Sequence, residues 1–213
     1  MVSVGAVLGV AAVALGLVLT PGPNMIYLVS RSISQGRAAG MVSLGGVAVG
    51  FLCYLMAAAV GLASLFQAVP AAYHVVKIAG AAYLGFLAWQ TLRPGGRSAF
   101  ETYEGEGHSR RRLFTLGLVT NLLNPKIALL YAALLPQFVS PDHGPVWQQF
   151  LQLGAVQIVV AVTVNALIVL TASAIAVYLV RHPAVLRAQR WGSGTLLGAF
   201  AVKMAFSHAP ARP

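Results

Sequence analysis

Long apolar segments separated by short polar ones dominate the pattern along the chain. A segment of about 20 apolar residues can cross the hydrocarbon core of a bilayer as a helix. Six segments meet this condition, at residues 4–29, 39–66, 72–92, 113–139, 147–180 and 191–208. The pattern predicts six transmembrane helices, and therefore an all-α integral membrane protein.

Only one connection between these segments is long and polar, RPGGRSAFETYEGEGHSRRR at 93–112. It divides a single transmembrane domain (1–213) into two groups of three spans, 4–92 and 113–208. With an odd number of spans in each group, the second crosses the membrane in the opposite sense, so a repeat of this kind is inverted. Aligning Pro125 with Pro23 supports two inverted three-helix repeats.

Composition agrees with a membrane location, since 58% of the residues are hydrophobic and 8% are charged, against about 25% charged in soluble domains. The net charge of +10 could suggest nucleic acid, but its distribution indicates otherwise. Lys and Arg are absent from the second and fourth predicted loops (67–71 and 140–146), whereas the first, third and fifth loops contain Arg31, Arg37, Arg93, Arg97, Arg110, Arg111, Arg112, Arg181, Arg187 and Arg190. This asymmetry predicts cytoplasmic odd loops and both termini outside, and no nucleic-acid partner.

Acidic residues and cysteines are scarce. Glu101, Glu104 and Glu106 lie in the third predicted loop and Asp142 in the fourth, and Cys53 is the only cysteine. We therefore expect no disulfide within the chain, no metal site, no cofactor and no carboxylate proton relay in the membrane.

If the chain couples its function to protons, Lys126, Lys77, His74 or a substrate must titrate. His74 and Lys77 lie one turn apart near the outer end of the third span, which makes them candidates for coupling or gating. The alternative is that both side chains reach up to the interface. That alternative is favoured for His74 and evenly balanced for Lys77.

Helix-breaking residues interrupt two predicted spans, at LTPGPNMIYLVS (19–30) and around Pro125. Proline lacks an N–H and leaves the carbonyl four residues earlier without its helical partner. Pro21 thus releases the carbonyl of Leu17, and Pro125 that of Asn121. The helix that restarts beyond each break offers free N–H donors. A zwitterionic amino acid needs both, acceptors for its ammonium and donors for its carboxylate.

The residues around the two breaks are the candidate substrate-binding site. They are Thr20, Pro21, Gly22, Pro23, Asn24, Asn121, Asn124, Pro125 and Lys126. A lysine inside a membrane span is costly and indicates function. The alternative is a proline kink capped by asparagines, which we would favour for a single break. Two breaks at matching positions of inverted halves favour a transport site near the membrane midplane.

Small residues predict close helix packing on two spans. Gly46, Gly50, Ala57 and Gly61 follow one side of the second span, and Gly194 and Gly198 form a GxxxG motif in the last. Such motifs let membrane helices approach closely. We favour packing within the monomer over a dimer interface for both.

PGPN at 21–24 and NPKIALLYAALLPQFV at 124–139 resemble the LysE/RhtB family of amino-acid exporters. The similarity also takes in SQGRAAGMVSLGGVAVG, KIAGAAYLGFLAWQTLR and the last span, nearly the whole chain. The resemblance implies six spans in two inverted halves, a homodimer, and export of amino acids or their derivatives across a bacterial inner membrane. Its motif residues include Pro21 to Asn24 and Asn124 to Lys126.

One departure from the family bears on the substrate. Many members that resemble exporters of basic amino acids carry an acidic residue where this chain reads GFLCY at 50–54. With Phe51 there, we expect a neutral substrate such as threonine, homoserine or a branched-chain amino acid.

Three alternatives stay open at this point. An exporter of metal ions or another small solute is disfavoured by the lack of ligand clusters in the spans. An intramembrane enzyme would need a nucleophile with a base or a motif such as HExxH, and neither is found. A membrane assembly subunit would give no reason for paired breaks.

Overall fold

The structure is a computed structural model, and every regular element in the residues that it describes is helical. It describes residues 2–20, 22–62, 75, 78, 81–82, 85–86, 88–89, 92–93, 107–181 and 183–206. The helices are α1 (Val4–Leu19), α2 (Pro23–Gln35), α3 (Arg37–Ala57), α6 (Arg110–Leu122), α7 (Pro125–Leu129), α8 (Val146–Arg181) and α9 (Pro183–Phe206). Shorter π and 3-10 turns complete them: η1 (Ala58–Leu62), η2 (Leu130–Leu134), η3 (Leu135–Phe138) and η4 (Pro141–His143). The all-α prediction is confirmed.

Two helices in the described residues are long and apolar enough to cross a membrane, Arg37–Gly61 and Val146–Ala172. Two bent pairs meet the same condition if each crosses as one unit. They are Val4–Leu19 with Pro23–Gln35, bent by 55°, and Arg110–Leu122 with Pro125–Phe138, bent by 49°. The structure therefore provides two to four candidate spans. Most of the predicted third span lies outside the described residues, so six spans in two inverted repeats stay a prediction.

Several helix ends differ from the predicted span ends. α2 continues through Arg31 to Gln35, where Gly36 turns the chain with a φ of 87° that favours glycine. α6 begins at Arg110, so its first turn includes the last three residues of the predicted 93–112 linker. α9 begins at Pro183, eight residues before the predicted span. Hydropathy marks what lies in lipid, whereas prolines, glycines and caps such as Ser109 set where a helix ends.

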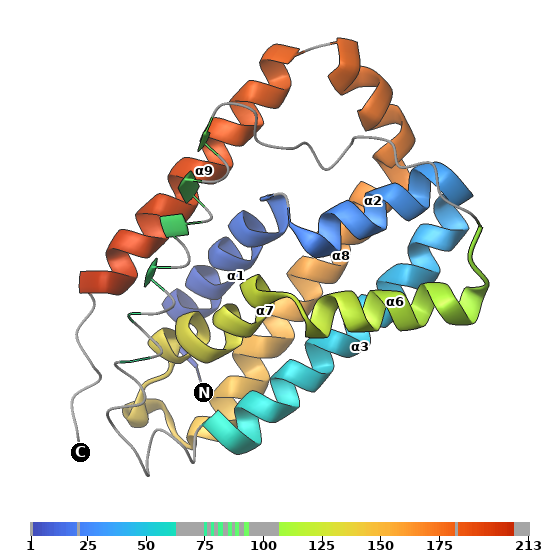
Figure 1. Cartoon of the computed structure of the whole chain (residues 1–213). Coiled ribbons are helices and arrows are strands. Elements are labelled where there is room, and N and C mark those ends of the chain that lie inside the picture. Colours follow the sequence, from blue (N-terminus) through green and yellow to red (C-terminus); the bar gives the residue numbers. More distant parts are fainter. Residues whose placement is uncertain are drawn as a thin grey trace.

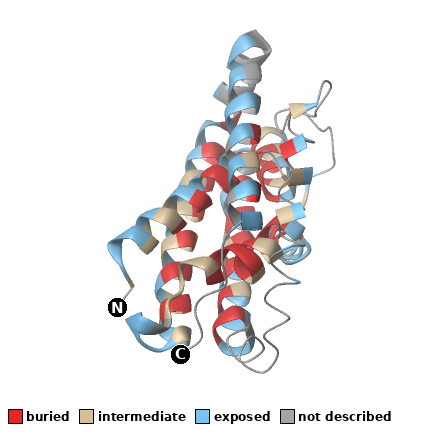
Figure 2. Cartoon of the chain, turned by 90° about the vertical axis from the view of Figure 1, so that its left-hand side faces the viewer, coloured by how far each residue is buried: buried red, intermediate tan, exposed pale blue. Residues whose placement is uncertain are grey.

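α8 is the central helix of the bundle. It packs against α1, α2, α3 and α9, and Figure 1 shows it passing behind both bent pairs. Its 36 residues correspond to about 54 Å, well beyond the thickness of a hydrocarbon core. Leu153 and Val169 of α8 are fully buried in the core. Figure 2 shows that buried residues gather where the helices pack together.

The closest helix contact joins α3 to α6 through glycines. A Cβ on Gly46 would collide with the carbonyl oxygen of Phe114, and one on Gly117 with that of Ser43. Gly50 is also close to α6, since its Cβ would lie 2.7 Å from the side chain of Asn121. The predicted packing face on the second span is thus correct for Gly46 and Gly50.

The same prediction is wrong at the far end of the second span. Ala57 and Gly61 are exposed, and nothing lies within 4 Å of a Cβ on Gly61. Ala57 is the last residue of α3, and Gly61 lies in η1, where the wider π-helical turn shifts it from the side that Gly46 and Gly50 occupy. In α9, Gly194 packs against Leu92, as close packing within the monomer requires.

Candidate functional site

The two helix breaks are built alike. Each second helix restarts on a proline in its first turn, Pro23 in α2 and Pro125 in α7. Proline suits this position because its missing N–H would have no helical partner there. The residue before each proline, Gly22 or Asn124, has extended backbone. Both predicted breaks are therefore confirmed.

Lys126 connects the second break to the first. Its Nζ donates to the carbonyl oxygen of Leu17 at 2.7 Å and to that of Thr20 at 2.8 Å. In a continuous helix the Leu17 carbonyl would accept from residue 21, which is proline. The prediction that the break frees this acceptor is confirmed, and the structure shows that the ammonium of Lys126 occupies it.

Lys126 is 6% exposed, and both partners of its ammonium are neutral carbonyls. Removing a charged group from water costs several kcal/mol unless it is well paired. The two carbonyl dipoles offset part of this cost. Asn124 supports the backbone of the lysine, because its Oδ1 accepts from the Lys126 N–H at 3.1 Å. A buried cation held in this way indicates a functional site.

Gly22 leaves room for the ammonium. Its φ of −168° is ordinary extended backbone, so no conformational reason requires glycine. The reason is steric, since a Cβ here would lie 2.9 Å from the Nζ of Lys126 and 3.3 Å from its Cε. Any larger residue at position 22 would displace Lys126.

Thr20 contributes its backbone to the site. Its side chain is fully buried, and its Oγ1 donates to the carbonyl of Gly16 at 2.8 Å. The hydroxyl thus caps the last turn of α1 from within. The carbonyl of Thr20, not its hydroxyl, is what reaches Lys126.

Three buried asparagines around the breaks have unpaired amide atoms. Among the residues that the structure describes, no hydrogen-bond partner is found for Asn24 Oδ1, for Asn124 Nδ2 or for either polar atom of Asn121. Native proteins leave few buried polar atoms unpaired, and each such atom calls for an explanation. Four of them around one pair of breaks leave hydrogen-bonding capacity for a polar guest.

One prediction about the second break is wrong. The carbonyl of Asn121, which Pro125 was expected to leave free, accepts from the N–H of Asn124 at 3.0 Å. The chain turns tightly between α6 and α7, so the backbone recaptures this acceptor. The side chain of Asn121 packs against Gly50 of α3.

A small cavity lies beside Lys126, with a volume of about 20 Å³ for the centre of a water-sized sphere, which is room for about one water molecule. Its walls come from both bent pairs, α3 and α8. Of the predicted site residues, Asn24 and Lys126 line it, together with apolar side chains that include Phe51 and Leu130. Thr20 and Gly22 lie around the lysine ammonium, and Pro23, Asn124 and Pro125 form the starts of the helices that follow the two breaks.

Sequence reasoning missed the contribution of α8. Gln157 and Asn165 line the cavity and are both 2% exposed. The hydroxyl of Tyr131 in η2 donates to Gln157 Oε1 at 2.6 Å, and Asn165 Nδ2 donates to the Ala161 carbonyl at 2.8 Å. The available signal was two amides eight residues apart in an apolar helix, which places them on one face.

Pro21, His74 and Lys77 lie outside the described residues, so their predicted roles stay predictions. Within the described part of the chain, no group of three or more His, Cys, Asp or Glu residues is placed to hold a metal ion.

The helices, the paired breaks and the buried lysine define a helical membrane protein with a polar site in its interior. The chain belongs to the LysE type translocator family, which matches residues 15–208. The predicted family is confirmed, and with it the expectation of a multi-pass membrane transporter rather than an enzyme.

Three relatives of this chain show how much sequence it shares with other proteins. The homoserine/homoserine lactone efflux protein of Salmonella typhimurium is 37% identical over 148 residues, 70% of this chain and 71% of the relative. The leucine efflux protein of Salmonella choleraesuis is 32% identical over 130 residues, 59% of each chain. An uncharacterised membrane protein of Pseudomonas aeruginosa is 30% identical over 196 residues, 89% of each. No solved structure matches this chain.

Proposed function

We propose that this chain is a secondary transporter that exports neutral amino acids, or their derivatives, from the bacterial cytoplasm by alternating access. The observation that carries the proposal is the bond from Lys126 to the Leu17 and Thr20 carbonyls, at the meeting point of the two breaks. A site formed by both bent pairs can change its exposure when the pairs move relative to each other.

The contacts of Lys126 revise which group binds which end of an amino acid. Since its ammonium occupies the acceptors at the first break, those carbonyls are not open to a substrate ammonium. Lys126 instead presents its remaining N–H and its positive charge to the cavity, where a substrate carboxylate would bind. The unpaired Asn24 Oδ1 is the acceptor that a substrate ammonium would use. Asn121 and Asn124 complete the proposed site.

A neutral substrate agrees with the cavity and with the relatives. Among the described residues that line the cavity, none is acidic, so a cationic side chain would find no charge partner there. Two of the relatives named above carry homoserine, its lactone, or leucine in their names, all with uncharged side chains. Threonine, homoserine and branched-chain amino acids are the proposed substrates.

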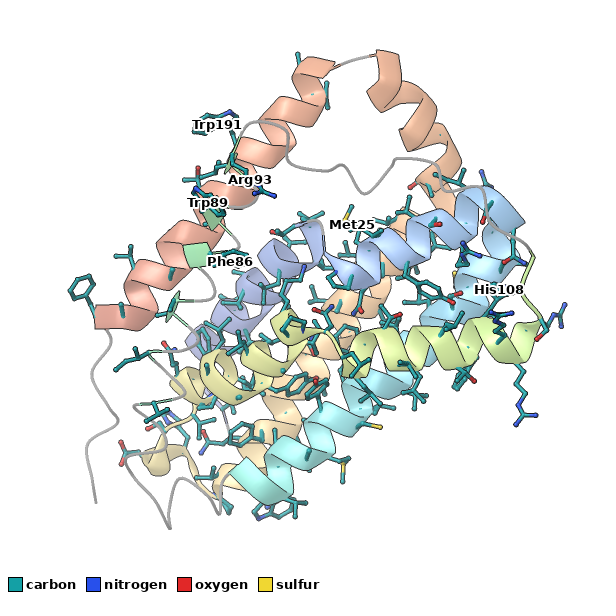
Figure 3. The ribbon with its side chains drawn as sticks, in the orientation of Figure 1. Met25, Phe86, Trp89, Arg93, His108 and Trp191 are labelled. Atoms are coloured by element: carbon teal, nitrogen blue, oxygen red, sulfur yellow. The ribbon has the colours of Figure 1, made fainter. Side chains whose placement is uncertain are left out.

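Hydrogen bonds at both ends of the bundle suit alternating access. At one end, Tyr27 Oη donates to the Leu113 carbonyl at 2.8 Å and Gln35 Nε2 to the His108 carbonyl at 3.1 Å. Figure 3 shows His108 beside the far end of α2, away from Met25 at the break. At the other end, Gln149 Nε2 donates to Ser140 and Gly144 carbonyls at 2.7 and 2.8 Å. We propose that one set breaks while the other holds.

The proposal is tested by efflux from proteoliposomes loaded with radiolabelled threonine, homoserine, leucine and lysine. The wild-type chain is expected to export the first three in preference to lysine. Lys126→Met removes the cation and is expected to abolish export, while a monodisperse peak in detergent shows that the variant inserts and folds. Thr163→Val, on the exposed side of α8, is the matched control and retains export. Full export by Lys126→Met contradicts the assigned role.

A further inference from the structure

Two amide side chains of α8 face the cavity across from the breaks. Gln157 and Asn165 are 2% exposed and line the same cavity as Lys126 and Asn24. Eight residues apart, they lie about 12 Å apart along one face of α8, with Ala161 between them. They flank the middle of the candidate span Val146–Ala172, the depth at which a transported molecule is held.

Each side-chain amide uses only one of its two polar atoms in a hydrogen bond. Gln157 uses its Oε1 to accept from Tyr131, and Asn165 uses its Nδ2 to donate to Ala161. These two bonds use Gln157 Oε1 and Asn165 Nδ2, and leave Gln157 Nε2 and Asn165 Oδ1 as the atoms that a guest in the cavity could bond. The side of the cavity formed by α8 thus offers one uncharged donor and one uncharged acceptor, in an otherwise apolar helix.

The neighbours of the two amides place this wall opposite both bent pairs. Gln157 is bonded to Tyr131 of η2, on the second pair. Asn165 precedes Ile168 by one turn, and Ile168 packs in one buried cluster with Met25 of α2, on the first pair. A substrate with its carboxylate at Lys126 and its ammonium at Asn24 would therefore turn its side chain toward α8.

Buried polar groups of this kind discriminate between substrates. An apolar wall cannot strongly reject an added hydroxyl, whereas a wall with unpaired polar atoms rejects a substrate that leaves them unpaired. Leaving one buried donor or acceptor unpaired costs about 1–3 kcal/mol. The unengaged atoms would be satisfied by a hydroxyl or amide on the substrate, and would stay unpaired against an aliphatic group.

We infer that Gln157 and Asn165 are specificity-determining residues, which make this protein favour amino acids with an uncharged hydrogen-bonding side chain over aliphatic ones of the same size. The inference rests on the proposed function, because it assumes that amino acids occupy the cavity. It adds to that function the residues that select the substrate side chain and the kind of side chain that they favour.

Threonine and valine are the matched test pair, since a hydroxyl in one replaces a methyl in the other. Binding of both radiolabelled amino acids to the purified full chain in detergent, and their export from proteoliposomes, give a preference ratio. The wild type is expected to prefer threonine by about tenfold or more.

Two variants separate the two amides. Asn165→Leu removes one, and its lost bond lies within α8 itself. Gln157→Leu is combined with Tyr131→Phe, so that no buried hydroxyl loses its acceptor. We expect the threonine preference to fall severalfold in at least one of these variants and to be lost when all three changes are combined. Thr163→Val, which removes a hydroxyl from the exposed side of α8, keeps the wild-type ratio.

Each outcome of this experiment is decisive. Unchanged ratios in all variants overturn the inference, as does a wild type that does not distinguish threonine from valine. An equal loss of both amino acids also overturns it, because it assigns the amides to binding the substrate backbone. A wild type that binds and exports no amino acid overturns the proposed function, and the inference with it.

Discussion

The Nζ of Lys126 lies 2.7 Å from the carbonyl oxygen of Leu17, 109 residues earlier in the chain. This bond exists because proline at position 21 cannot supply the helical donor that the Leu17 carbonyl would otherwise accept. The first break thus provides the acceptor and the second provides the cation. The two breaks are thus joined by a hydrogen bond that needs both of them. A simple proline kink would not explain this arrangement.

Gly22→Ala should displace the ammonium of Lys126 without changing its charge. The new Cβ would lie 2.9 Å from Nζ, too close for the present geometry. Because the backbone at Gly22 suits any residue, the effect is steric, and we expect a loss of about 1–3 kcal/mol in stability together with reduced export. The shift of the thermal unfolding midpoint in detergent measures the first effect, and proteoliposome efflux the second.

The control for this variant is Gly198→Ala in α9, where the nearest atom to a new Cβ is Ala88 Cβ at 3.9 Å. Replacing glycine by alanine inside a helix is favourable by about 1 kcal/mol when space allows. Gly198→Ala should therefore keep or raise the unfolding midpoint and retain export. Equal behaviour of the two variants would contradict the steric role of Gly22.

Thr20→Val should distinguish the role of the Thr20 carbonyl from that of its hydroxyl. The substitution removes the hydroxyl that donates to Gly16 at 2.8 Å but keeps the carbonyl that accepts from Lys126. We expect a stability loss of about 1 kcal/mol and near wild-type efflux. A full loss of efflux with an unchanged unfolding midpoint would instead assign the Thr20 hydroxyl to the substrate.

The sequence was sufficient for those parts of the site that follow from local backbone rules. Proline frees a carbonyl wherever it occurs in a helix, so the two breaks and the released Leu17 acceptor could be predicted. What fills that acceptor could not, because the reach of Lys126 depends on how two distant segments pack. The Asn121 carbonyl shows the limit of the local rule, since a tight turn returned a donor to it.

The amides of α8 were overlooked for a related reason. Gln157 and Asn165 sit in an unbroken helix, where two amides eight residues apart in an apolar segment are a weaker signal than a proline break. Their significance comes from the cavity that they face, which is a property of the packed bundle. Arg31 is the converse case, because a polar position expected in a loop is a 7% exposed part of α2.

The predicted orientation, with both termini outside, can be measured directly. A chain with Cys53→Ser and Ser3→Cys carries a single thiol, placed before α1. In intact cells we expect a membrane-impermeant maleimide to label it. The physical reason is the concentration of arginines in the odd-numbered loops, which holds those loops in the cytoplasm.

A cysteine at Ser109, in the predicted cytoplasmic linker, is the control and should react only after permeabilisation. The reverse pattern would contradict the predicted orientation.

Gly46→Ala and Gly45→Ala compare neighbouring positions on α3. A Cβ on Gly46 would collide with the backbone carbonyl of Phe114 in α6, whereas one on Gly45 would meet the ring of Phe114 at 3.7 Å, an ordinary contact. Backbone cannot move aside as a side chain can, so Gly46→Ala must separate α3 from α6, the helix that carries Asn121. We expect it to lower the stability by about 2–3 kcal/mol and Gly45→Ala to leave it unchanged or raise it. Thermal unfolding followed by size-exclusion chromatography in detergent distinguishes the two. Similar midpoints would show that α3 and α6 are not in close contact through Gly46, and would remove the support that this packing gives to the second break.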